Sequence, residues 1–191
     1  IHQWRLSEKR KLGIGSGIRL TSFAGANLYY ITAPGKLTSG SSGPLIIFKD
    51  NIAGNIDSVL VKSPQVNAIN LMLNLDYRVS EKITIGFNID LIGFSFGKSQ
   101  RVNYINGFQG KNSQASPTAF NILLISDNDR GSLNSELYAR YKVSERWELK
   151  VAAQFLFTEY STDEDVQEFP EKNNRFRNKS LLAAFGVIRK L

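Results

Sequence analysis

The amino-acid sequence predicts an all-β fold, an antiparallel up-and-down β-barrel of eight strands. Apolar and polar residues alternate over stretches as long as Ile69–Val79 and Trp147–Phe157, which is the period of a β-strand and not that of a helix. Only about three residues separate neighbouring stretches, so consecutive strands form antiparallel hairpins.

Six long strands are clear from this alternation. They span residues 10–22, 66–79, 83–96, 131–143, 147–159 and 177–191. Closed barrels that cross a membrane have an even number of strands, from eight upward, so two more are needed. We expect both in segment 23–65, where the short β-prone runs 26–33 and 45–49 are separated by turn residues. Alternatively, His2–Leu6 is the end of a preceding strand, and an N-terminal hairpin is missing from the chain.

A repeated turn sequence sets the polarity of the sheet. Arg78–Lys82 reads Arg-Val-Ser-Glu-Lys, Lys142–Arg146 is nearly identical, and Arg5–Lys9 is a third copy. The other ends of the strands are joined by long polar segments at roughly 23–65, 97–130 and 160–176. One end of the barrel therefore carries tight turns, and the other carries large loops.

Composition excludes several classes of function. The 191 residues suffice for a single domain, 1–191. The absence of cysteine excludes a disulfide framework, a thiolate metal site and a thiol nucleophile, and the one histidine, His2, lies nearly at the N-terminus. We therefore expect no catalytic site, no metal and no cofactor. The net charge of +7 is concentrated at the short-turn end, where it suits lipid phosphates. Nucleic acid is not expected, because no basic groove is interleaved with aromatic residues.

The apolar face of such a sheet points either into a soluble lipocalin-like barrel or outward into lipid. Three features favour lipid. The strands are long enough to cross, with short turns at one end and long loops at the other. Four aromatic residues at the short-turn end would form an interfacial girdle: Trp4, Tyr77, Tyr141 and Trp147. The polar face carries charges of both signs in near balance, and we expect these nine to pair in the interior: Arg19, Asp76, Arg78, Asp90, Glu136, Arg140, Lys142, Glu148 and Lys150.

With these features the chain resembles the small outer-membrane β-barrel proteins of Gram-negative bacteria. The resemblance rests on the alternation, the Val-Ser-Glu turns and a C-terminal strand in which Gly186 and Leu191 match the spacing of the family's assembly signal. Arg189 departs from that signal, and the last residue is not aromatic. The resemblance implies an outer-membrane location after removal of a signal peptide, periplasmic turns, extracellular loops and contact with outer-membrane lipid. It implies no particular activity.

The interior is predicted to be closed, because a barrel of eight strands is filled by its own side chains and paired charges satisfy one another there. Gly13, Gly15 and Gly17 alternate within a strand and make room for long side chains from across the interior. They are not a phosphate-binding loop, since no helix start follows.

The long loops hold the candidate contact residues, since binding residues concentrate in loops. They are Tyr29, Tyr30, Ile46, Ile47, Phe48, Phe120, Ile122, Leu123 and Leu124, which either pack over the barrel mouth or dock another outer-membrane protein. The acidic run 163–168 is interpreted as a solvated loop.

The predicted function is therefore structural or interaction-based and not enzymatic, with a place as a subunit of a larger outer-membrane complex. The alternatives are a barrel that handles lipid or a small ligand (a carrier, a narrow pore or a lipid-modifying enzyme) and a soluble lipocalin-like binder.

Overall fold

The computed structural model describes residues 2–5, 11–43, 46, 48–105, 112–124 and 128–190, and for His2, Gln3 and Arg5 it describes the backbone. Strands make up 65% of the structure and helices 7%. The strands form one antiparallel sheet, which confirms the predicted all-β antiparallel class. None of the helices in the described part of the chain has the length and apolar character needed to cross a membrane.

Twelve strands lie in the described residues. They are β1 (His2–Arg5), β2 (Leu12–Ala24), β3 (Leu28–Thr32), β4 (Ser58–Val61), β5 (Gln65–Arg78), β6 (Ile83–Gly97), β7 (Gln100–Tyr104), β8 (Asn112–Pro117), β9 (Phe120–Ile122), β10 (Leu133–Lys142), β11 (Trp147–Thr162) and β12 (Arg175–Arg189). The strand order is β1-β2-β5-β6-β10-β11-β12-β3-β4-β7-β8, and β9 pairs with β6. The six long strands predicted from alternation are β2, β5, β6, β10, β11 and β12, with ends shifted by at most three residues.

The predicted count of eight strands is wrong. Segment 23–65 supplies two strands, as expected, and β3 lies in the predicted run 26–33. The second, β4, lies at Ser58–Val61 and not in the predicted run 45–49, of which the described residues 46, 48 and 49 are outside any strand. β1 lies in the stretch named as the alternative. However, β7, β8 and β9 come from segment 97–130, which the sequence analysis treated as a loop. β7 and β8 are only five and six residues long and expose mostly Arg, Asn and Gln. Because so few apolar residues alternate in them, they give no clear strand signal.

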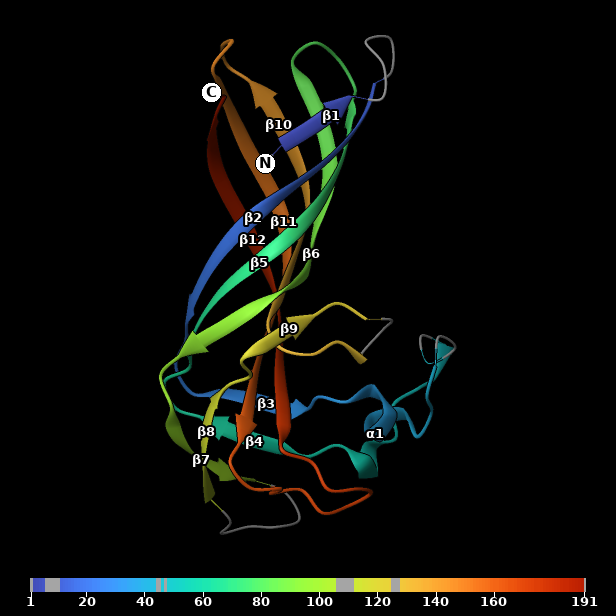
Figure 1. Ribbon diagram of the computed structural model, residues 1–191, viewed down its shortest axis with the longest axis vertical. Helices are drawn as coiled ribbons and strands as arrows, with labels where there is room; N and C mark the ends of the chain where they lie inside the picture. The colour runs from blue at the N-terminus through green and yellow to red at the C-terminus, as the bar shows by residue number, and fades with distance from the viewer. Residues whose placement is uncertain are drawn as a thin grey trace.

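The sheet divides along the long axis of the molecule into two halves (Figure 1). We call the upper half the stem. It consists of β1, β2, β5, β6, β10, β11 up to Phe157 and β12 from Asn178, and it contains both ends of the chain. We call the lower half the cap. It consists of β3, β4, β7, β8, the remaining ends of β11 and β12, the helix α1 (Gly35–Ser39) and the short 3-10 turn η2 (Ala53–Asn55).

The cap is a closed ring of six strands. Starting from β11, the pairing runs through β12, β3, β4, β7 and β8 and returns to β11. The ring encloses an apolar core formed by Tyr30, Val59, Val61, Val66, Val102, Tyr104, Ala115, Tyr160, Val166 and Phe176. Two edge-to-face ring pairs lie in it: Tyr30 with Tyr160, and Tyr104 with Phe176, at centroid distances of 5.4 and 6.0 Å. The cap therefore has the interior of a soluble protein.

The stem has the opposite arrangement, although β11 and β12 run through both halves. In the stem part of β11, Leu149 points outward and is 50% exposed, while the neighbouring Glu148 points inward and is buried. In the cap part, Tyr160 points inward and is fully buried. Inward positions stay at even residue numbers throughout, because side chains alternate across a strand. The apolar side of the sheet thus reverses at the junction of stem and cap.

Three buried tyrosines make the cap less stable at alkaline pH. Burial is the main cause that raises the pKa of Tyr30, Tyr104 and Tyr160 above the ordinary value near 10. Above that pH the unfolded chain loses these protons while the folded cap keeps them. Stability is therefore complete below pH ~10 and falls as the pH rises further, by up to about 1.4 kcal/mol per tyrosine and pH unit.

This prediction is checked by denaturant unfolding of the cap between pH 8 and 11 (from roughly two units below to one unit above the free tyrosine pKa), followed by near-UV circular dichroism. In Tyr30→Phe the unfolding free energy should fall less with rising pH, because one of the contributing tyrosines is removed. The unfolding free energy of the same variant at pH 8 is the reference. An unchanged slope in Tyr30→Phe would contradict the prediction.

Candidate functional site

The interior of the stem is filled by ion pairs that join strands on opposite sides. Arg19 of β2 is the central cation. Its Nη1 lies 3.1 Å from Oδ1 of Asp90 on β6, and its Nη2 lies 3.6 Å from Oε2 of Glu136 on β10. It also donates to the backbone oxygen of Asn134 at 2.9 Å and to the side-chain oxygen of Asn88. One guanidinium therefore connects three strands.

Further pairs extend the network toward the short-turn end. Arg140 contacts Asp76 at 2.8 Å and Glu148 at 3.6 Å. Lys150 contacts Glu136 at 2.8 Å, and Lys190 pairs with Glu148. The network thus contains four cations and four anions: Arg19, Arg140, Lys150, Lys190, Asp76, Asp90, Glu136 and Glu148. This cluster has no net charge, so it presents no excess of one sign to a passing ion.

Seven of the nine residues predicted for the interior are brought together in this way. Arg78 is exposed and lies outside the network. Lys142 instead pairs with Glu145 across the neighbouring turn, at 2.6 Å. Both residues lie at the ends of their strands, where an inward position already faces solvent. Lys190 was not among the predicted interior residues. Its even number nevertheless places it on the inward side of β12, two residues after Ile188, which pairs in register with Glu148.

Neutral side chains that were not among the predicted interior residues complete the network. Asn70 donates to Asp90 at 2.8 Å, and Asn88 donates to Glu136 at 2.9 Å. Tyr138 donates to Asn74 at 2.8 Å. These residues occupy inward positions of the alternation. Their inward positions could have identified them from the sequence as members of the network, because buried polar groups need hydrogen-bond partners.

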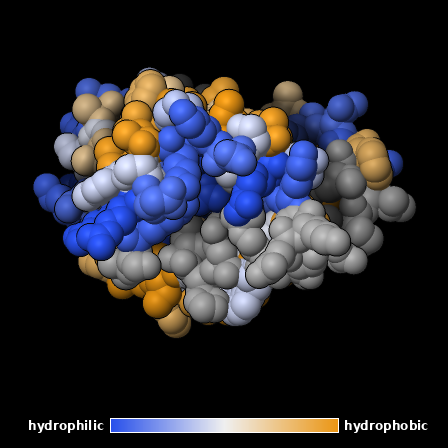
Figure 2. Space-filling model, turned by 90° about the horizontal axis from the view of Figure 1, so that it is seen from above, coloured by the Kyte–Doolittle hydropathy of each residue, from blue (hydrophilic) through white to orange (hydrophobic). Residues whose placement is uncertain are grey.

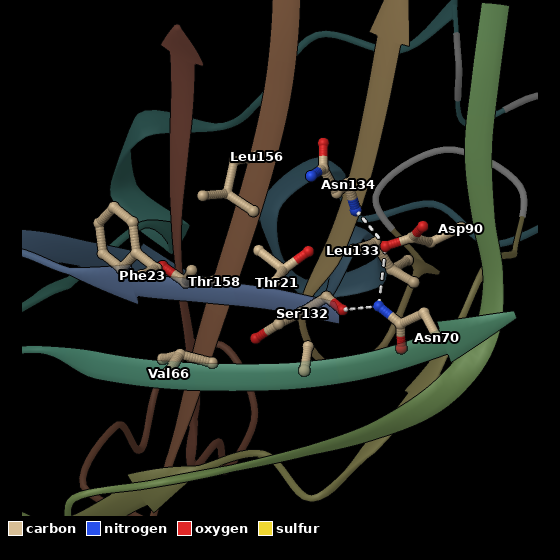
Figure 3. Close-up of a pocket in the computed structure, with 11 residues that line it drawn as sticks. Thr21, Phe23, Val66, Asn70, Asp90, Ser132, Leu133, Asn134, Leu156 and Thr158 are labelled. Carbon is tan, nitrogen blue, oxygen red and sulfur yellow. Dashed lines mark hydrogen bonds between the residues drawn. The ribbon is translucent and has the colours of Figure 1, made fainter. Parts of the chain in front are cut away.

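A small cavity lies where the charge network meets the cap core (Figure 3). Its walls include Asp90, Asn70 and Ser132 on one side and the apolar Val66 and Leu156 on the other. The volume is about 10 Å³, which is room for about one water molecule. This part of the interior has no space for an organic ligand.

Glycine on one strand makes room for a large side chain from the next, as expected for a filled interior. A β-carbon at Gly86 would overlap the phenol of Tyr138 and lie 2.7 Å from the backbone oxygen of Leu75. At Gly13, which the sequence analysis assigned to this purpose, it would lie 2.6 Å from Asp76. Gly13 thus leaves space for the carboxylate of Asp76, which pairs with Arg140. Contrary to expectation, it does not make room for a long side chain.

Gly86→Ala is therefore expected to destabilise the protein by about 1–3 kcal/mol, the usual cost of overpacking a filled interior. The added methyl group displaces Tyr138 and breaks its bond to Asn74. Urea unfolding in detergent measures the effect. The matched control is Gly54→Ala, because a β-carbon at Gly54 would meet no atom within 4 Å. Equal stability of the two variants would contradict the tight fit at Gly86.

The four residues of the predicted girdle lie at the same end of the stem. Trp4, Tyr77, Tyr141 and Trp147 are all exposed, on β1, β5, β10 and β11. Two carry a cation above the ring: Lys11 over Tyr77 at 5.9 Å and Arg189 over Trp147 at 5.8 Å. Seen along the axis from this end, hydrophilic residues extend across the surface, with hydrophobic residues at its margin (Figure 2).

The candidate loop contacts separate into buried and exposed residues. Tyr30 and Ile46 are buried, so they belong to the interior and offer no contact surface. Ile122 and Leu123 are partly covered, and Phe120 packs edge-to-face on Phe94. The exposed ones are Tyr29, Phe48, Phe120 and Leu124. Ile47 lies outside the described residues.

A second ion cluster, which the sequence alternation does not predict, lies at the junction of stem and cap. Glu159 of β11 accepts hydrogen bonds from Arg175 and Arg177 of β12, with shortest distances of 2.8 and 2.9 Å. Both arginines also donate to the backbone oxygen of Asp129, and the backbone nitrogen of Glu159 donates to Ser132. The three charged side chains have odd numbers and so lie on the outer side of the sheet. Segment 128–132 covers these side chains, and the hydrogen bonds to Asp129 and Ser132 hold the segment in place.

The part of the chain that the structure describes contains no group of three or more histidine, aspartate or glutamate side chains arranged to hold a metal ion. Comparison of the chain with protein-family models, with curated proteins and with solved structures found no match.

Proposed function

We propose that the protein is an outer-membrane β-barrel protein that sits in lipid through its stem, keeps a closed interior and acts as a structural or interaction protein through its cap. The reversal of the apolar face along β11 and β12 carries the proposal. One pair of strands is apolar outside in the stem and apolar inside in the cap, as suits a chain that passes from hydrocarbon into water.

The outward face of the stem supports the membrane part of this proposal. Large apolar side chains are exposed on every long strand of the stem, for example Leu20, Leu71, Phe94, Leu137, Leu149 and Phe185. A soluble monomer rarely exposes a continuous apolar patch larger than a few hundred Å². A surface of this kind is stable where it is covered, and lipid covers all strands equally.

The dimensions agree with a lipid layer. The stretch from Trp147 to Phe157 rises ten residue steps, about 33 Å along the strand. With the usual tilt of roughly 40°, its height along the axis is about 25 Å, which is that of the apolar band of such barrels. Trp147 marks one boundary, and the ion cluster around Glu159 lies just beyond the other.

The filled interior favours an interaction role over transport. Within the stem, Arg19 and Arg140 close the space between strands, and the cavity beside them holds about 10 Å³. A carrier or a lipocalin-like binder needs a cavity of several hundred Å³ for its ligand. The cap, in contrast, exposes large aromatic side chains to solvent, namely Tyr29, Phe48 and Phe169, and we assign contact with another outer-membrane protein to this surface.

Site-directed spin labelling tests the location of the two halves. The chain contains no native cysteine, so Leu149→Cys in the stem and Asn103→Cys on the outer side of β7 in the cap each accept one label. In lipid bilayers the label at Leu149 should collide preferentially with a lipid-soluble quencher. The label at Asn103 should collide with a water-soluble one.

Each label is the control for the other, since both point away from the sheet. Preferential quenching of both by the water-soluble agent would refute the membrane assignment and leave a soluble protein with an exposed apolar stem. Protection of Leu149 from both agents would mean that a protein partner, and not lipid, covers the stem.

A further inference from the structure

A shallow hollow lies on the outer face of the stem, where β10, β11 and β12 run side by side (Figure 1). Its volume is about 520 Å³. The outward side chains that line it are the small Ala139, Ala153 and Ala183 and the larger Leu137, Val151 and Phe185. Ala153 lies between Leu137 and Ala183 in the register of the sheet. The hollow therefore exists because alanines on neighbouring strands leave a space that larger residues border.

Only an apolar group suits this hollow. None of these six side chains has a polar atom, and the backbones of the three strands pair with one another. A polar ligand would lose its hydrogen bonds to water there without gaining replacements. A hydrocarbon chain loses none, and it gains van der Waals contacts with the side chains that line the hollow.

A positively charged cluster lies on the cap side of the hollow, where the outer face of the stem meets the cap. We call it the basic edge, and it consists of Arg130, Arg175, Arg177 and Lys179. The anions beside it among the described residues are Asp129 and Glu159. Four cations and two anions leave an excess of two positive charges, and such an excess attracts anionic groups.

The contacts within the basic edge show the same excess. The single carboxylate of Glu159 pairs with both Arg175 and Arg177. Nη1 of Arg177 is buried and has no hydrogen-bond partner within the described part of the chain. Lys179 is exposed, and its Nζ lies 5.7 Å from the centre of the Phe157 ring. An anion that approaches the stem from outside therefore meets the ammonium group of Lys179 first.

The spacing between the basic edge and the hollow fits a single lipid molecule. Lys179 pairs in register with Phe157, and Ala183, four residues further along β12, pairs with Ala153. Four residues span about 13 Å along the strand, or about 10 Å along the axis of the stem at the usual tilt of roughly 40°. One half of an apolar band about 25 Å tall is about 12 Å deep. An acyl chain that starts from a phosphate beside Lys179 thus reaches the hollow within its own half of the membrane.

We propose that the basic edge and the hollow together form a binding site for one membrane lipid with an anionic phosphate headgroup. The phosphate lies at Lys179, and one acyl chain fills the hollow. Clusters of basic residues at a membrane surface bind lipid phosphates in this way. The inference rests on the proposed membrane location of the stem, and it adds a preference for one class of lipid at one place on the outer face.

Quenching of tryptophan fluorescence by brominated lipids tests the site. The two tryptophans of the chain, Trp4 and Trp147, are replaced by phenylalanine, and Phe155→Trp places a single tryptophan on the outer face between the basic edge and the hollow. The protein is incorporated into phosphatidylcholine bilayers that contain a small fraction of chain-brominated lipid, either phosphatidic acid or phosphatidylcholine. Phosphatidic acid should quench more strongly, and the ratio of the two gives its relative affinity for the site.

Two substitutions separate the headgroup from the acyl chain. Lys179→Gln should lower the relative affinity for phosphatidic acid about fivefold, since one basic residue near a membrane surface contributes about 1 kcal/mol to the attraction of anionic lipid. Its matched control is Lys82→Gln, which removes an exposed cation at the short-turn end and should change nothing. Ala153→Phe fills the hollow and should also lower the affinity. Its control is Val187→Phe, because Val187 is exposed on β12 outside the hollow.

The outcomes distinguish this site from the membrane location itself. Equal quenching by the two lipids, or a preference that Lys179→Gln leaves unchanged, would overturn the inference while the stem remains in lipid. Quenching by neither lipid would overturn both the inference and the proposed function. A preference that Ala153→Phe leaves unchanged would exclude the hollow from the site. Quenching that falls as more protein is incorporated per lipid would overturn the inference in favour of a second copy of the chain in the hollow.

Discussion

Glu159→Gln is expected to destabilise the protein by about 3–5 kcal/mol, the usual cost of breaking a buried ion pair from one side. Glu159 is fully buried, and Arg177 beside it is 1% exposed. The carboxylate accepts hydrogen bonds from Arg175 and Arg177 at once. Glutamine has nearly the same shape but no charge, so the buried Arg177 and the partly buried Arg175 are left with only neutral acceptors.

The effect should appear first at the junction of stem and cap. Because both arginines also hold the backbone of Asp129, the variant should release segment 128–132 before the stem unfolds. Hydrogen exchange of this segment and urea unfolding of the whole protein in detergent measure the two effects. Faster exchange of the segment is expected together with the loss in unfolding free energy.

The matched control is Glu171→Gln, the same substitution in an exposed pair. Glu171 contacts Lys36 at 3.0 Å, and both side chains are more than half exposed, so the cost should be at most about 1 kcal/mol. Adding Arg177→Met to Glu159→Gln should recover part of the loss, since one uncompensated charge is removed. Equal effects of Glu159→Gln and Glu171→Gln would contradict a buried, charged cluster.

The stem could be predicted from sequence because one rule governs all of it. Each long strand other than β12 has one predominantly apolar face, and that face stays on one side from the short turn to the junction. On β12 the inward Leu182, Ala184 and Ile188 are apolar as well. Leu149, Val151 and Phe155 illustrate this on β11, where the inward positions between them hold Lys150, Ala152 and Gln154. Period-two alternation over such a length has one structural interpretation, and the strands therefore agree closely with their predicted bounds.

The cap could not be predicted in the same way, because its strands are short and its apolar side chains point inward and not outward. On β7 only Val102 and Tyr104 point inward, with Arg101 and Asn103 facing solvent. Two apolar residues with one position between them occur in many loops. The ring closes through the pairing of β8 with β11, residues far apart in the sequence, and local patterns do not encode such contacts.

The interior charges were found by position along the alternation, and the errors lie where position alone is insufficient. Arg78 has the inward parity of Asp76 but lies at the open end of its strand. Glu159 has the outward parity of exposed residues, yet a segment from elsewhere in the chain covers it. An even or odd position along a strand tells on which side of the sheet a side chain lies. Whether that side chain is buried depends on what packs against that side.

Arg19→Met is expected to cost about 3–5 kcal/mol for the same physical reason, now within the stem. Methionine occupies a similar length but leaves Asp90, which is fully buried, without its cation. Glu136 keeps Lys150 and Asn88 as partners, so the penalty falls mainly on Asp90. Asn70 and the backbone nitrogen of Asn134 still donate to its Oδ2, but neutral donors do not replace a positive charge.

Arg78→Met is the matched control, because Arg78 has the same parity but is exposed and outside the network; its effect should stay within about 0.5 kcal/mol. Adding Asp90→Asn to Arg19→Met should restore much of the lost stability, since both charges then leave the interior together. Urea unfolding in detergent measures all four proteins. If Arg19→Met costs no more than Arg78→Met, water reaches Asp90 and the interior is open. If the double variant is as unstable as Arg19→Met, Arg19 stabilises the stem by filling space and not by its charge.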